Sequence, residues 1–97
     1  MKTDIVKLLK SFNMSKEDIN TCFLVCPDLK SADYKNAFLN TELLDIYGYP
    51  EFEVGTLLLI NPKILTIDPK ELNKKLKSLG ENVEFMIKNN PFFVWGN

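Results

Sequence analysis

Two cysteines, Cys22 and Cys26, are the only thiols in this sequence, which contains no histidine. A spacing of four residues places both side chains on adjacent turns of a helix. Two ligands cannot close a zinc site, and a reduced cysteine among Phe, Leu and Val behaves as a small hydrophobe. We therefore expect a reduced, buried pair rather than a redox or metal motif, and we predict no metal and no cofactor.

Acidic side chains are concentrated around Gly48 in the middle of the chain. They are Glu42, Asp45, Glu51 and Glu53. Paired carboxylates can perform acid–base or magnesium chemistry, but no nucleophile or phosphate-binding loop accompanies them. We expect the acids to stabilise a helix N-terminus through its dipole, and we predict that the protein is not an enzyme. Alternatively, the acidic patch attracts a basic protein or mimics nucleic-acid phosphates.

Lysines form the main candidate binding surface, on a helix expected over residues 69–79. They are Lys70, Lys74, Lys75 and Lys77. Three of them lie on the face opposite the leucines, with Lys75 at its edge. Together with Lys63 and Lys88 they would contact nucleic-acid phosphates, or they form an ordinary solvated face. The chain has twelve lysines, no arginine and a net charge of −1, which argues mildly against a nucleic-acid partner.

The C-terminal segment PFFVWGN holds three aromatic residues within four positions. Phe93 aligns with apolar residues of the preceding units described below and should be buried. Phe92 and Trp95 have no such counterparts, so they are candidates for a protein interface, in a homodimer or with a partner protein. The alternative is that the tail folds back over the last helix.

Three prolines organise the elements that carry these residues. Pro27 and Pro62 lie 35 residues apart, and at this offset the preceding apolar positions match one another. A shorter third copy aligns on Pro91. Each unit reads as helix, tight turn, helix, proline and short apolar tail, over residues of about 3–31, 38–67 and 69–97.

Local signals place the helix ends. Asn13, Gly48 and Gly80 suit the left-handed conformation that ends a first helix. Second helices should start after Ser15 and at Pro50, and Asp68 should cap the helix that begins at Pro69. Each second helix must stop before its proline, at Cys26, Asn61 and Asn90, because proline disfavours a helical residue before it and donates no hydrogen bond. A short turn would then carry Leu29, Ile64 and Phe93 inward.

The last turns of the second helices suggest which units are internal. Before Pro27 and Pro62 these turns are apolar all round, which predicts helices covered on more than one side. The third unit instead has Lys88 and Asn89 there. We expect it to be a polar terminal cap of a complete chain; the alternative is simple divergence of a shorter helix.

The pattern of a Gly-ended helix, a second helix, Asn-Pro and an apolar pair resembles the repeat of the mitochondrial transcription termination factor (mTERF) family. It is carried by Tyr47-Gly48, Asn61-Pro62, Ile64-Leu65, Leu79-Gly80, Asn90-Pro91 and Phe93-Val94, and more weakly by Cys26-Pro27. The resemblance implies a superhelix of helical triplets, binding to double-stranded DNA or RNA, and no catalytic residue.

We therefore predict an all-α fold, a short right- or left-handed α-solenoid of about three helix-turn-helix-proline repeats in one domain over residues 1–97. We expect a non-enzymatic module that binds nucleic acid, or alternatively a small protein-interaction module or inhibitor acting through its acidic middle or aromatic C-terminus. No apolar run approaches the ~20 residues that span a bilayer, and the N-terminus resembles no targeting peptide. The expected location is cytoplasmic, as a monomer or homodimer.

Overall fold

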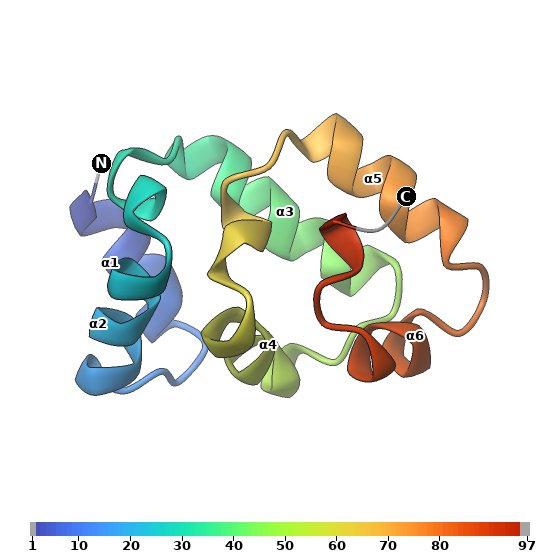
Figure 1. The fold of residues 1–97 in the computed structure, drawn as a ribbon, viewed down its shortest axis with the longest axis horizontal. Coiled ribbons are helices and arrows are strands. Elements are labelled where there is room, and N and C mark those ends of the chain that lie inside the picture. Colours follow the sequence, from blue (N-terminus) through green and yellow to red (C-terminus); the bar gives the residue numbers. More distant parts are fainter. Residues whose placement is uncertain (1, 96–97) are drawn as a thin grey trace.

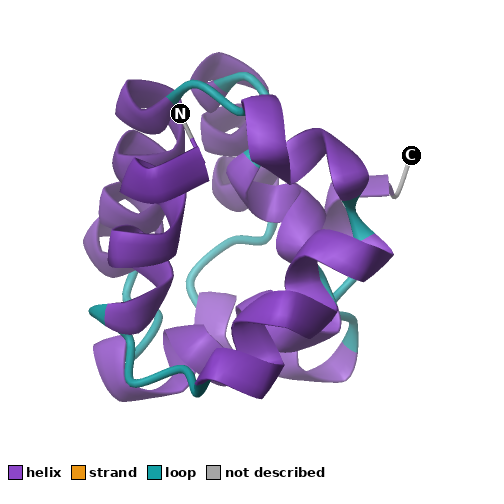
Figure 2. Cartoon of the chain, turned by 90° about the vertical axis from the view of Figure 1, so that its left-hand side faces the viewer, coloured by secondary structure: helices purple, strands orange, loops and turns teal. Residues whose placement is uncertain are grey.

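The computed structural model describes the backbone of residues 2–95 and the side chains of residues 3–94. This part of the chain is helical and contains no strand, which confirms the all-α prediction (Figure 2). The α-helices are α1 (Lys2–Lys10), α2 (Lys16–Val25), α3 (Tyr34–Ile46), α4 (Val54–Ile60), α5 (Pro69–Ser78) and α6 (Val83–Asn89). The 3₁₀ helices are η1 (Pro27–Ser31), η2 (Glu51–Glu53), η3 (Pro62–Leu65) and η4 (Phe93–Trp95).

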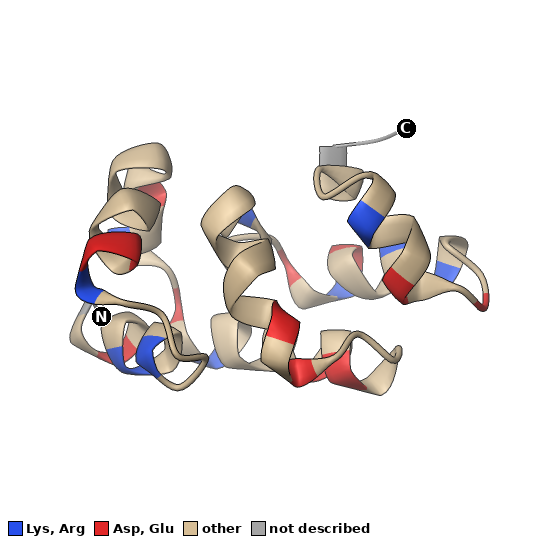
Figure 3. Cartoon of the chain, turned by 90° about the horizontal axis from the view of Figure 1, so that it is seen from below, with Lys and Arg blue, Asp and Glu red and all other residues tan. Residues whose placement is uncertain are grey.

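Three helix pairs follow one another along the longest axis of the molecule, which measures 34 Å against 22 and 21 Å for the others (Figure 1). The first helices of the pairs are in contact, α1 with α3 and α3 with α5. Among the second helices α2 packs on α4, and Figure 3 shows α2, α4 and α6 side by side. Each pair is followed by a 3₁₀ helix, and η1 contacts η3.

The turns within the pairs have the expected backbone geometry. Asn13, Gly48 and Gly80 have φ angles of 63°, 94° and 80°, the left-handed conformation in which glycine and asparagine are tolerated. Ser15 caps α2 by accepting a hydrogen bond from the Asp18 amide at 3.1 Å. These turn predictions are confirmed.

The starts of α4 and α3 both differ from the positions that the sequence predicted. Pro50 was expected to begin a helix, but it precedes the 3₁₀ helix η2, and α4 begins only at Val54. Asp33 caps α3 by accepting from the Lys35 amide at 2.9 Å, so α3 begins at Tyr34, ahead of the second unit's expected start. The same arrangement at α5, where Asp68 accepts from the Lys70 amide, was predicted and is confirmed.

The second helices all end at the residue before a proline. Cys26, Asn61 and Asn90 have φ angles of −131°, −140° and −147° and ψ angles of 82°, 77° and 83°. These nearly equal, non-helical conformations arise because the proline ring crowds the residue before it. The chain then turns inward and buries Leu29, Ile64 and Phe93, as expected. The predicted role of the prolines is therefore confirmed.

The expectation that the last turns of α2 and α4 are covered on several sides is wrong. Phe23 and Leu58 are buried, but Leu24 is 81 % exposed, Val25 62 % and Ile60 45 %. Because the second helices lie in a row at one edge of the molecule, neighbouring helices cover only part of their circumference (Figure 3). Their outward positions therefore face solvent although they are apolar.

Candidate binding surfaces

The lysine face of α5 has the predicted geometry. Leu72 and Leu76 are fully buried against the core, whereas Lys70, Lys74 and Lys77 are exposed. None of these three forms an ion pair with residues 3–94. Their ammonium groups are thus available to an anionic ligand. Lys75 is half-buried at the edge of this face and makes an interaction of its own.

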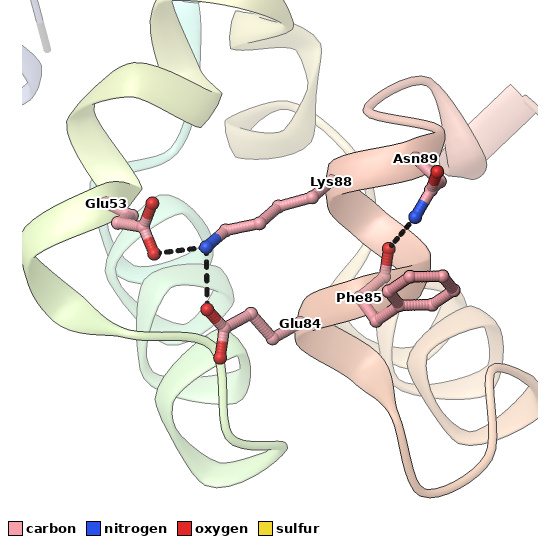
Figure 4. A network of polar contacts seen from close by, with 5 residues as sticks. All are labelled: Glu53, Glu84, Phe85, Lys88 and Asn89. Atoms are coloured by element: carbon pink, nitrogen blue, oxygen red, sulfur yellow. Dashed lines mark hydrogen bonds and ion pairs between the residues drawn. The ribbon is translucent and has the colours of Figure 1, made fainter.

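Lys88 does not extend the lysine face, because two carboxylates neutralise it. Its Nζ lies 2.5 Å from Glu53 Oε2 on η2 and 2.6 Å from Glu84 Oε2 on α6 (Figure 4). The hydrogen bond to Glu53, followed by that to Glu84, raises the pKa of Lys88 above its usual range. This charged cluster ties the middle pair of helices to the last pair, and one carboxylate of the acidic middle acts as a structural partner.

The remaining acids of the middle segment point to solvent. Glu42, Asp45 and Glu51 are exposed. Glu51 and Glu53 lie in the first turn of the short helix η2, close to the expected position at a helix start. Within the described part of the chain, no three acidic, cysteine or histidine side chains are gathered as a metal-binding group.

The two cysteines form the expected buried, unbridged pair. Cys22 is completely buried, and its Sγ donates a hydrogen bond to the Leu58 carbonyl at 3.6 Å, which joins α2 to α4. Burial, with a smaller contribution from the Asp18 carboxylate, raises the pKa of the Cys22 thiol to about 11. A thiol held in its neutral form is a poor nucleophile and metal ligand, so Cys22 contributes to packing.

Three amide and hydroxyl groups form long-range hydrogen bonds that the sequence did not indicate. Asn61 and Tyr47 join the middle pair of helices to the last pair, and Asn40 joins α3 to η3 and the residues after it. The fully buried Asn40 donates from Nδ2 to the carbonyls of Ile64 at 2.8 Å and Ile67 at 2.9 Å. Asn61 Nδ2 donates to the Pro91 carbonyl at 3.1 Å, and the Tyr47 hydroxyl donates to Asn73 Oδ1 at 2.7 Å. The burial of Asn40 could have been predicted from its helical spacing, because it lies on the same buried face of α3 as Ala37 and Leu44.

A groove crosses the ends of α2 and α4, next to the prolines that follow these two helices. The groove has a volume of about 280 Å³. The residues that line it include Val25, Pro27, Asp28, Ile60, Pro62, Lys63 and Phe92. We call it the proline groove. Phe92, a predicted interface residue, is 41 % exposed at this groove, whereas Phe93 is buried as expected. The side chain of Trp95, the other predicted interface residue, lies outside the described residues.

Comparisons with other proteins add no assignment: no family model, curated protein or solved structure matches the chain. Among residues 2–95 no helix combines the length and hydropathy that crossing a bilayer would require.

Proposed function

We propose that this chain is a non-enzymatic binding domain of three helical repeats, stacked as a short α-solenoid, that contacts the backbone of double-stranded nucleic acid through α5. The near-identical conformations of Cys26, Asn61 and Asn90 support the repeat, since equivalent positions of stacked units share their backbone geometry. The resemblance of the Asn-Pro segments to the mTERF repeat supports the ligand class.

The observation that carries the nucleic-acid proposal is the exposed lysine face of α5. Lys70, Lys74 and Lys77 present three positive charges, unpaired among residues 3–94, on one side of a helix that its leucines fix to the core. Lysine contacts phosphate as a point charge, and phosphate contacts position a protein without reading sequence. We therefore expect weak, sequence-independent and strongly salt-dependent binding.

Fluorescence anisotropy with labelled duplex DNA and duplex RNA tests this proposal. Three phosphate contacts predict that log K falls with log[salt] with a slope of about −3 for B-form DNA. The variant Lys70→Glu/Lys74→Glu/Lys77→Glu should lose binding. The matched control Lys7→Glu/Lys10→Glu/Lys16→Glu makes the same change of charge on exposed positions of α1 and α2 and should retain most of it. Equal affinity losses in the two variants would show that only net charge matters, and would refute a site on α5.

A second candidate function, binding of a protein partner, is favoured by the exposed apolar side chains. Phe52 is 86 % exposed, and Leu24, Ile46 and Phe85 also face solvent. Contiguous exposed apolar patches mark interaction surfaces, and these side chains supply apolar area for such a patch. A partner held by apolar contacts would be captured from a cytoplasmic extract after nuclease treatment and at high salt, whereas capture through phosphate contacts would be lost under both conditions.

A further inference from the structure

We propose that the proline groove is the interface of a two-fold symmetric dimer, in which its occupant is the same groove of a second copy of the chain. This inference does not depend on nucleic-acid binding, because none of the α5 lysines lines the groove.

The first argument is the equivalence of the two halves of the groove. Val25, Pro27 and Asp28 come from the end of α2 and from η1, and Ile60, Pro62 and Lys63 occupy the same positions relative to their own proline at the end of α4 and in η3. The groove therefore presents the order of a branched apolar residue, a proline and a charged residue twice, side by side, where η1 contacts η3.

The second argument is that the charges of the two halves are opposite. The first half carries Asp28 and the second half carries Lys63 at the equivalent position. Neither side chain forms an ion pair with residues 3–94, so no charge of this part of the chain neutralises them. A binding surface with one acid and one base, each unpaired, is complementary in charge to a copy of itself turned through 180°.

One two-fold axis uses both the equivalence of the two halves and their opposite charges. It lies in the interface and runs across the groove, between η1 and η3. It places the first half of one copy on the second half of the other, because an isologous interface pairs each position reciprocally. Val25 of each copy then meets Ile60 of its partner copy, and the Asp28 carboxylate approaches the Lys63 ammonium. Apolar side chains would fill the centre with charged pairs at the rim, as in protein interfaces generally.

Exposure of the residues at the centre agrees with this assignment. Val25 is 62 % exposed and Ile60 45 % exposed at adjacent helix ends, and Phe92 extends the apolar surface beyond the second half. These side chains therefore keep part of their apolar surface in contact with water. Association of two copies would remove them from water.

Charge reversal with sedimentation equilibrium tests the pairing. Wild type should show a concentration-dependent monomer–dimer equilibrium. Asp28→Lys and Lys63→Asp alone should each weaken dimerisation about tenfold or more, since each converts two attractive rim pairs into repulsive ones. An equimolar mixture of the two variants should form a heterodimer, because both rim pairs become attractive again. The chain with both substitutions should form a homodimer for the same reason.

Apolar substitution supplies an independent test. Ile60→Ser should abolish the dimer, whereas Ile46→Ser, on an exposed position of α3 outside the groove, should leave it unchanged. Circular dichroism confirms that each variant is folded. A wild-type chain that remains monomeric at all concentrations would overturn the proposal, and so would a dimer insensitive to the single charge reversals or a variant mixture that stays monomeric.

Discussion

Gly55 provides the sharpest test of how the helix pairs pack, because local and tertiary effects predict opposite outcomes there. It is buried near the start of α4, where this helix meets the turn after α1. A Cβ at this position would stand 2.7 Å from the Phe12 carbonyl oxygen and 3.3 Å from Met14 Cγ. The first distance is shorter than real contacts of a Cβ, so Gly55→Ala forces the turn and the helix apart.

The two contributions can be compared. Alanine favours a helix over glycine by about 1 kcal/mol in a helix interior, and by less near a helix end. Overpacking a well-filled site costs about 1–3 kcal/mol. The upper part of this range applies because the obstructing atom is a backbone carbonyl, which cannot rotate away as a flexible side chain would. We therefore expect Gly55→Ala to lower the free energy of unfolding by about 1–2 kcal/mol.

Urea unfolding followed by far-ultraviolet circular dichroism measures this change. With a denaturant slope of about 1–1.5 kcal/mol/M, the midpoint should fall by about 1 M. Thr56→Ala is the matched control, since Thr56 is the next residue of α4 and is exposed; its midpoint should stay close to that of wild type. A Gly55→Ala midpoint equal to or above that of wild type would show that helix propensity dominates, and would refute the close packing of α4 on the turn.

Three further measurements test other parts of the structure. Asn40→Asp removes both hydrogen bonds from Nδ2 and buries a charge, so the unfolding free energy should fall by about 3–5 kcal/mol. The exposed control Asn36→Asp on the same helix should change the unfolding free energy little in the same urea titration. Burial raises the pKa of Cys22 from 9.0 to about 11, so its contribution to stability is complete below pH 9 and is lost as the pH rises toward 11. Between pH 8 and pH 10 the unfolding free energy of wild type should fall by about 1 kcal/mol more than that of Cys22→Ala. Parallel plots of unfolding free energy against pH for the two proteins would contradict this. Asn13 has a φ angle of 63°, so Asn13→Val should lower the thermal midpoint and Asn13→Gly should not; equal midpoints would argue against the left-handed turn.

Helix boundaries were predictable where the responsible interaction lies within a few residues. The proline after Asn61 disfavours a helical conformation for that asparagine through a local steric clash that does not depend on the surrounding elements. The same holds for the turn at Gly80 and for the cap formed by Asp68, which depend on their own backbone and nearest neighbours. The delayed start of α4 after Pro50 was not predictable from the same signals, because proline is suited to the start of a 3₁₀ turn as well as to that of an α-helix.

The lysine face of α5 was also predictable, because its helical spacing separates lysines from leucines. The ion pair between Lys88 and Glu53 was not, since Glu53 lies 35 residues away on another element. The same limit concealed Asn40, whose buried hydrogen bonds reach residues 24 and 27 positions further along the chain. The sequence indicated which side chains are charged, apolar or able to form hydrogen bonds, but it could not identify the partners that the fold brings to them.

The sequence by itself thus determined the helical content, the left-handed turns, the breaks at the prolines and the burial of Leu29, Ile64 and Phe93, since these follow from backbone sterics and short-range apolar spacing. Only the tertiary structure decided that Leu24, Val25 and Ile60 face solvent. Their apolar character is the same whether or not a neighbouring helix covers them, and coverage depends on how the pairs stack. The proline groove arises in the same way, from side chains that become neighbours only when η1 and η3 come into contact.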